Sequence, residues 1–288
     1  MKKKLTIPDI YQIKKKGEKA ALLTAYDYPT ALIEDEAGID IILVGDSLAM
    51  TVLGYKNTLS VTLDEMLVFT KAVTRAVERA FVVGDMPFLT YKTDPYTAIE
   101  NAGRFIQEAN ADAVKLEGAG DIIPNIKAIV GAGIPVMGHI GLTPQSIGIL
   151  GGFRVQGTKK EAALKLIDDA KRLEDAGVFA IIAESIPSEL TPIIRDKLKI
   201  PLYGIGAGPE TDGQILVVHD ILGLFEDFIP RFVKKYADLN KILKDAFKTY
   251  IQDIKDGKFP DAEKSYHIDK KVLDEIKKVL LQQEKQNK

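Results

Sequence analysis

Short apolar runs recur along the chain, and stretches with the apolar spacing of helices lie between most of them. The runs are rich in Ile, Val and Leu and too short for helices, which is typical of buried parallel strands. Eight such runs are found, at residues 20–25, 39–44, 81–83, 111–116, 134–137, 178–183, 200–203 and 215–218. Helical patterns over residues 64–79 and 159–176 separate some of them, and Asp94-Pro95 predicts the start of a helix over residues 96–109.

A recurring junction joins the helical stretches to the apolar runs. Gly38, Asn110, Gly133 and Gly177 each follow a polar, helix-like segment and precede an apolar run. Gly and Asn readily adopt the left-handed conformation that ends a helix. Eight alternating units favour a closed (β/α)8 barrel over an open doubly wound sheet. The last unit is the least regular, because residues 211–214 are too few for a full helix.

Past about Leu222 the sequence turns strongly helical and charged. We expect a single barrel domain over residues 1–288, in which residues 224–288 form a helical tail that packs on the barrel or on a neighbouring subunit. No linker or low-complexity segment indicates a second domain.

The composition is that of a globular enzyme, with 46% hydrophobic and 28% charged residues among 288. The net charge of -2 gives no reason to expect nucleic acid or a membrane surface as partner. The absence of cysteine excludes disulfides, thiolate zinc sites and a cysteine nucleophile, and it fits a reducing cytoplasm. No apolar stretch approaches the ~20 residues of a membrane helix, so we expect a cytoplasmic protein.

Three of the apolar runs lead into an acidic residue, namely Asp46, Asp85 and Glu117. Parallel α/β enzymes carry their chemistry where strands end in loops. An acid at such a place can also simply cap the next helix, but three in successive units favour a shared site. Three carboxylates without cysteine predict a hard divalent cation held through oxygen.

Four further side chains extend this candidate site. Lys115 stands two residues before Glu117, so both point to one face of a strand, and a lysine inside a barrel needs a charged partner or an anionic ligand. A purely structural ion pair would satisfy Lys115 equally. Glu184 ends the sixth run, where partial desolvation suits a general base, although a helix cap is the alternative. His139 and His219 end the fifth and eighth runs, and each is as consistent with a packed histidine as with a catalytic one.

Two glycine-rich segments follow strands. Residues 204–208 could bind phosphate through backbone amides or merely allow close packing. Residues 141–157 form a long segment that predicts a lid or binding loop.

Several motifs, in order, resemble those of the ketopantoate hydroxymethyltransferase family. They include VGDSLAM, VVGDMPF, AVKLEG, VMGHIGLTPQS, IAESIP and GIGAGPETDGQ, and the resemblance runs from about Asp9 to His267. It implies a barrel of the phosphoenolpyruvate/isocitrate-lyase type and a homo-oligomer, for which the family suggests a homodecamer. It also implies hydroxymethyl transfer from 5,10-methylenetetrahydrofolate to the oxoacid 3-methyl-2-oxobutanoate, which gives 2-dehydropantoate in the first step of pantothenate biosynthesis.

The resemblance implies a role for each candidate residue. The residues implied to hold one Mg²⁺ per subunit are Asp46, Asp85 and Glu117. Those implied to contact the oxoacid are Asp46, Ser47, Asp85 and Lys115. Glu184 is implied to be the base, and His139 could orient the substrate or shuttle a proton. Thr158 stands where a basic residue is expected in many relatives, a departure that could alter the affinity for the folate donor.

Two other functions stay open from the residues alone. A magnesium-dependent lyase or mutase could use the same acids on a 2-oxoacid, and folate-dependent turnover would separate it from a transferase. A non-catalytic barrel that binds a small anion would not need three aligned acids, and magnesium-dependent oxoacid binding would argue against it.

Overall fold

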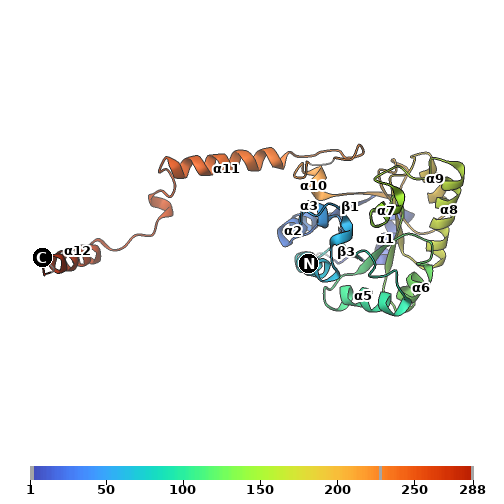
Figure 1. Cartoon of the computed structure of the whole chain (residues 1–288), viewed down its shortest axis with the longest axis horizontal. Coiled ribbons are helices and arrows are strands. Elements are labelled where there is room, and N and C mark those ends of the chain that lie inside the picture. Colours follow the sequence, from blue (N-terminus) through green and yellow to red (C-terminus); the bar gives the residue numbers. More distant parts are fainter. Residues whose placement is uncertain (1–2, 227–228, 287–288) are drawn as a thin grey trace. The chain divides into compact units, whose positions relative to one another are not determined.

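The eight expected strands form a closed parallel barrel in the computed structural model, which describes residues 3–226 and 229–286 (Figure 1). Their order around the barrel follows the sequence, and β8 pairs with β1 to close it. The strands are β1 Ala20–Thr24, β2 Ile41–Val44, β3 Phe81–Asp85, β4 Ala113–Glu117, β5 Val136–Gly141, β6 Ala180–Glu184, β7 Leu202–Ile205 and β8 Gly213–Leu216. The predicted (β/α)8 fold is therefore confirmed.

Five strands begin two residues later than the apolar runs that predict them. The apolar residues that precede these strands are Ile39, Ala111, Ile134, Val178 and Ile200, and all pack in the core between strands and helices. Their apolar character thus comes from burial, not from pairing in the sheet. At their carboxyl ends, β3, β4 and β6 extend through Asp85, Glu117 and Glu184, which are their last residues.

The eighth strand lies earlier than the run at residues 215–218 predicts. Gly213 already pairs with β1 and β7, and Val218 begins a short helix. The side-chain hydroxyl of Thr24 accepts a hydrogen bond from the Val218 amide at 3.0 Å, which draws the chain out of the sheet at this point.

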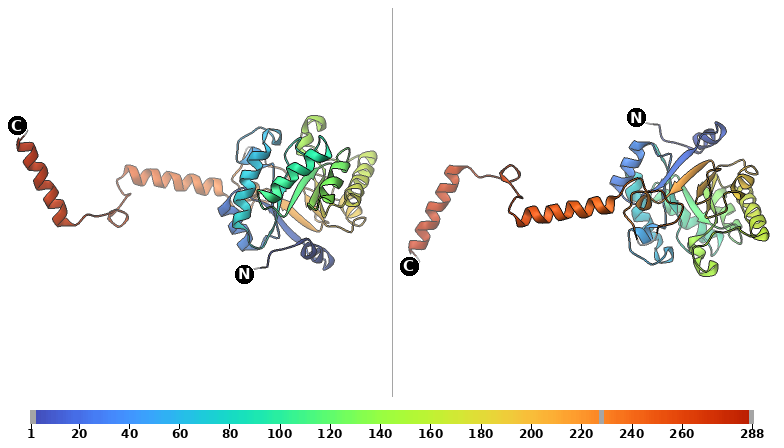
Figure 2. Two further views of the ribbon diagram at one scale, coloured as in Figure 1. Left: turned by 90° about the horizontal axis from the view of Figure 1, so that it is seen from below. Right: turned by 90° about the horizontal axis from the view of Figure 1, so that it is seen from above.

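Helices surround the strands of the barrel (Figure 2). The α-helices of this part are α1 Ile7–Lys15, α2 Tyr28–Ala37, α3 Leu48–Thr51, α4 Leu63–Ala76, α5 Pro95–Gln107, α6 Ile123–Gly131, α7 Ile147–Leu150, α8 Lys160–Asp175, α9 Leu190–Arg195 and α10 Val218–Ile221. Two 3₁₀ turns are η1 Thr58–Ser60 and η2 Pro144–Ser146. The Asp94 side chain caps α5 by accepting from the Thr97 amide, as predicted. Gly38, Gly133 and Gly177 end their helices at φ of 94°, 87° and 92°, as their junctions predict.

Alternate positions on the strands point into the barrel and build its interior in layers. On β3, Val83 belongs to a cluster of buried apolar side chains that fills the barrel interior, which we call the plug. Asp85, two residues later, points to the same side of the strand and lies beyond this plug. On β4, Ala113 belongs to the plug, and Lys115 and Glu117 follow it. The acids and the lysine are thus buried because they stand directly above an apolar core at the carboxyl ends of the strands.

The chain divides into two compact units, Met1–Ala237 and Asp238–Lys288. The second contains α11 Leu239–Lys255, the turn η3 Ala262–Lys264 and α12 Lys270–Gln286, and Figure 2 shows α11 and α12 as separate helices. Among the described residues of the helical tail predicted over residues 224–288, the first helix begins at Leu239. Pro230 lies in the irregular stretch before it and disfavours a helix there, since proline lacks the amide hydrogen and restricts the preceding residue. The packing of the tail stays a prediction.

None of the helices in the described part of the chain has the length and the apolar run needed to span a bilayer.

Candidate active site

The register of the barrel brings the candidate residues together at its mouth. Asp85 lies opposite Lys115 on the neighbouring strand, and Glu117 lies opposite His139. Glu184 ends the next strand, β6. Five polar side chains from four consecutive strands therefore converge on one end of the barrel.

Lys115 is the central cation of this cluster. Its Nζ donates to Asp85 Oδ2 at 2.7 Å and lies 3.5 Å from Glu117 Oε1. Burial acts to lower the pKa of Lys115, but the surrounding carboxylates outweigh it and raise the pKa, so the amine is charged at neutral pH. Lys115 thus has the charged partners that its buried position demands.

Asp46 and Asp85 are neighbouring buried acids whose ionised forms Lys115 does not fully stabilise. Asp85 Oδ2 accepts from the Asp46 amide at 3.0 Å, and Asp85 Oδ1 has no hydrogen-bond partner in the described structure. Burial, followed by the nearby charge of Asp85, raises the pKa of Asp46 well above its usual range. Burial also raises the pKa of Asp85, against the opposing effect of Lys115. A cation would stabilise the ionised form of both acids.

His139 lies between two carboxylates. Its Nδ1 is 3.3 Å from Glu117 Oε1, and its Nε2 is 3.2 Å from Glu184 Oε2. The ring nitrogens form ion-pair contacts rather than well-aligned hydrogen bonds. Burial acts to lower the pKa of His139, but the two carboxylates raise it to about 9. Burial acts to raise the pKa of Glu117, yet Lys115 and His139 lower it to about 2, so this pair is ionic at neutral pH.

Gln145 ties the acids to one another, and the sequence analysis missed it. Its Nε2 donates to Asp46 Oδ2 at 3.0 Å, and its backbone amide donates to Glu117 Oε2 at 3.0 Å. Its Oε1 accepts from the buried Tyr91 hydroxyl at 2.7 Å. Gln145 lies in η2, within the long loop that follows β5, and Thr143-Pro144 before it was the one local sign of an ordered turn.

Ser47 follows Asp46 and lies beside an aromatic pair. Its Oγ is 2.8 Å from the Tyr26 hydroxyl, and the Tyr26 ring packs against His219 with centroids 5.4 Å apart. His219 lies in α10, and burial lowers its pKa. Of the two roles considered for each histidine, packing therefore fits His219, whereas His139 belongs to the acid cluster.

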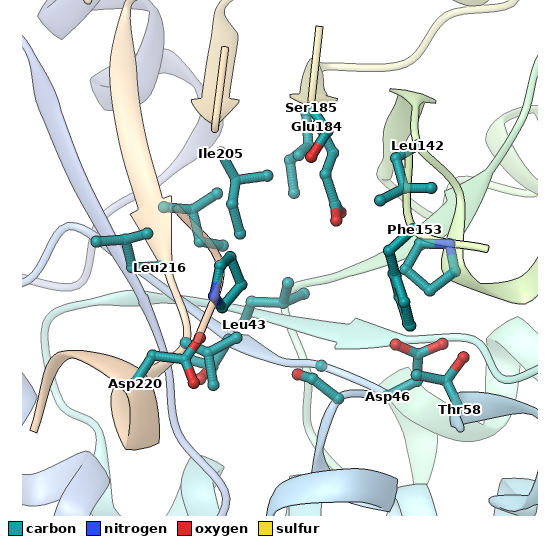
Figure 3. Close-up of a pocket in the computed structure, with 18 of the residues that line it drawn as sticks. Leu43, Asp46, Thr58, Leu142, Phe153, Glu184, Ser185, Ile205, Leu216 and Asp220 are labelled. Carbon is teal, nitrogen blue, oxygen red and sulfur yellow. The ribbon is translucent and has the colours of Figure 1, made fainter. Parts of the chain in front are cut away.

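A pocket of about 350 Å³ lies over the cluster. Asp46 and Glu184 extend into it from different sides, and Phe153 of the loop over residues 141–157 forms part of its wall (Figure 3). The long loop after β5 therefore borders the pocket, as a binding loop would. Ser185, directly after Glu184, adopts a φ of 48°, an uncommon conformation for a non-glycine residue that often marks functional sites.

The glycine-rich segment after β7 serves close packing. Gly206 has a φ of 63°, and a Cβ placed there would lie 2.4 Å from the Phe232 ring. Phe232 belongs to the irregular stretch that returns to the pocket after α10. Close packing, the second of the two expected roles, thus accounts for this glycine.

Asp46 and Asp85 are the residues best able to hold a hard cation. Both are buried carboxylates, and the unpartnered Asp85 Oδ1 is the kind of donor that Mg²⁺ prefers. Within residues 3–226 and 229–286, no three His, Asp or Glu side chains are already grouped as a ligand set. Lys115, His139 and the Gln145 amide contact the two oxygens of Glu117. The chemistry of these carboxylates fits a divalent cation.

Comparison with known proteins identifies the relatives of this chain. The model of the ketopantoate hydroxymethyltransferase family matches residues 4–262. The chain belongs to this family. The 3-methyl-2-oxobutanoate hydroxymethyltransferase of Clostridium novyi (strain NT) is 54% identical over 273 residues, which cover 95% of this chain and 99% of the relative. That of Acetivibrio thermocellus is 52% identical over 279 residues, which cover 97% and 99%.

Solved structures share the barrel fold of this chain. Phosphonopyruvate hydrolase, solved with oxalate and Mg²⁺, superposes with a TM-score of 0.59 at 12% identity and covers 96% of this chain and 97% of that one. 2,3-Dimethylmalate lyase, a member of the PEP mutase/isocitrate lyase superfamily, gives a TM-score of 0.57 at 17% identity over 96% and 98%. At these identities the likeness concerns the fold alone.

Proposed function

We propose that the chain transfers a hydroxymethyl group from 5,10-methylenetetrahydrofolate to 3-methyl-2-oxobutanoate, giving 2-dehydropantoate. Family membership over nearly the whole chain favours this reaction over a lyase, a mutase or an anion-binding barrel. The structural observation that carries it is one pocket into which Glu184 and the acid pair Asp46 and Asp85 both face, with Lys115 between. Removal of a proton next to a ketone requires a base together with positive charge that stabilises the enolate, and this pocket places the residues for both side by side.

The C3 proton of the oxoacid is weakly acidic, so its removal requires stabilisation of the enolate. Asp46 and Asp85 would hold one Mg²⁺ per subunit, with Glu117 as the third acid. When bound, the ion supplies a Lewis acid that polarises the keto and carboxylate oxygens of the substrate. Lys115 places a fixed positive charge beside the developing enolate oxygen, and Ser47 offers a hydroxyl to the substrate carboxylate.

Glu184 would take the C3 proton. Its side chain is 16% exposed, so it reaches the pocket while His139, charged near neutral pH, holds its Oε2 at 3.2 Å. His139 thereby orients Glu184, and it is placed to relay the proton onward. Water adds to the methylene carbon of the donor and releases it from tetrahydrofolate as formaldehyde. The enolate C3 then forms a C–C bond to this carbon, and the resulting alkoxide takes a proton to become the hydroxymethyl group.

The test is turnover by the full chain with Mg²⁺, the oxoacid and 5,10-methylenetetrahydrofolate, followed by mass spectrometry. We expect one 2-dehydropantoate for each tetrahydrofolate formed, and no consumption of the oxoacid without folate. Asp85→Ala should weaken Mg²⁺-dependent oxoacid binding, whereas Asp168→Asn on the exposed face of α8 should not. Folate-independent cleavage of the oxoacid would instead indicate a lyase, and unchanged Mg²⁺ affinity in Asp85→Ala would remove Asp85 from the metal site.

We further propose that the tail forms an interface within a homo-oligomer. Exposed apolar side chains recur along one face of α11, at Leu243, Phe247, Tyr250 and Ile254. Such a stripe is typical of a face that another surface covers. Light scattering of the chain and of Phe247→Glu tests this, because the substitution should lower the assembly mass. The cytoplasm is the compartment that we propose for this reaction.

A further inference from the structure

Asp220 is a pocket acid that the proposed chemistry does not use. It belongs to α10 and faces the pocket on another side from Glu184 and Asp46 (Figure 3). The residue is only 7% exposed, and burial is the only influence found on its pKa, with no hydrogen bond or ion pair of its carboxylate within residues 3–226 and 229–286. Burial raises its pKa to about 6, so the group is mostly ionised at neutral pH. The carboxylate is therefore open to the pocket, where a ligand can supply the donors that the protein does not.

The surroundings of Asp220 describe the shape of such a ligand. Apolar side chains line this part of the pocket, among them Leu216, Phe225 and Phe232. They offer flat walls to a ring, while Asp220 offers two acceptor oxygens at its edge. Arg154 and Arg231 line the pocket and are exposed, so its rim is positively charged.

The pocket also has more room than the oxoacid needs. Cavities of about 300–1,000 Å³ bind drug-sized ligands, and this pocket measures about 350 Å³. A small oxoacid bound at the acid cluster would leave the side near Asp220 free. The reaction needs a second molecule in the same pocket, within reach of the substrate.

We propose that Asp220 binds the pterin ring of the one-carbon donor, accepting from its 2-amino group and N3–H with the two carboxylate oxygens. This inference rests on the proposed function and deepens it. Two parallel hydrogen bonds to a carboxylate are strong and directional, and they require two adjacent donors on a planar edge. The pterin edge has them, its ring faces suit the apolar walls, and the carboxylates of the folate tail suit Arg154 and Arg231. The donor would then extend from Asp220 across the pocket toward the acid cluster.

The experiment measures binding of tetrahydrofolate and of its 2-desamino-2-methyl analogue to the full chain with Mg²⁺ and oxoacid. The unmodified chain should bind the analogue about 10–100-fold more weakly, because the analogue lacks one donor to a charged acceptor. Asp220→Asn should lose most of its affinity for tetrahydrofolate and should no longer distinguish the two ligands. Asp168→Asn, on the outer helix α8, should behave like the unmodified chain.

The outcomes separate the inference from the function on which it rests. If the unmodified chain binds tetrahydrofolate but does not discriminate against the analogue, or if Asp220→Asn discriminates as before, the pterin contact is wrong and the transferase proposal stands. If the unmodified chain neither binds tetrahydrofolate nor uses the methylene donor, both are overturned. The comparison of ligands on the unmodified chain needs no variant, so a folding defect in Asp220→Asn cannot obscure it.

Discussion

Replacing Lys115 by Met tests whether the acid cluster is built around one buried cation. The Lys115 side chain is 6% exposed and contacts Asp85 at 2.7 Å and Glu117 at 3.5 Å. Without its charge, three buried acids face one another across a low-dielectric pocket. Removing one partner of a buried ion pair costs about 3–5 kcal/mol, because it leaves the other charge uncompensated. At roughly 2–4 °C per kcal/mol for a chain of this size, the melting temperature should fall by about 6–20 °C.

The matched control is a lysine with an equally short contact at the surface. Lys171 lies 2.6 Å from Glu174, but its side chain is 48% exposed. Exposed pairs contribute about 0–1 kcal/mol, so Lys171→Met should shift the melting temperature little. Thermal unfolding without added metal is the assay, and the double variant Lys115→Met/Asp85→Asn should recover part of the loss. If Lys115→Met and Lys171→Met lower stability equally, the argument that Lys115 compensates buried acids is refuted.

Three further changes probe other parts of the structure. Both oxygens of Glu34 lack a partner in the described structure, and burial raises its pKa from 4.5 to about 8. The stability from protonated Glu34 is thus full below pH about 4.5 and is lost as the pH rises to about 8, and Glu34→Met should flatten this dependence in urea unfolding. Gly206→Ala should lower the melting temperature, since its Cβ would lie 2.4 Å from an aromatic ring, whereas Gly103→Ala within α5 meets no atom within 4 Å and should not. Gln145→Leu should weaken Mg²⁺ binding in calorimetry by about 10–100-fold, because it frees Asp46 from its donor, and unchanged affinity would exclude this positioning role.

Much of the fold could be predicted because an apolar run marks each strand and a glycine or asparagine follows four of the helices. Strand boundaries were less accurate, because residues such as Ile39 and Val178 are apolar for packing against helices rather than for pairing in the sheet. The helical tail was placed too early, since the apolar and charged residues after Leu222 mimic a helix that Pro230 opposes.

The candidate site was predictable as far as strand ends define it. Asp85, Glu117 and Glu184 are the last residues of strands, so the barrel itself brings them together. Gln145 and Asp220 could not be found in this way. They stand in a loop turn and in a one-turn helix, and only tertiary packing brings them to the pocket.

Proton exchange at C3 of 3-methyl-2-oxobutanoate tests the central claim most directly. Proton NMR in D₂O, with enzyme and Mg²⁺ but without folate, should show metal-dependent loss of the C3 signal. Glu184→Gln should still bind the oxoacid and metal but exchange about 10²–10⁴-fold more slowly. Exchange at an unchanged rate in Glu184→Gln, with binding intact, would contradict the assignment of Glu184 as the base.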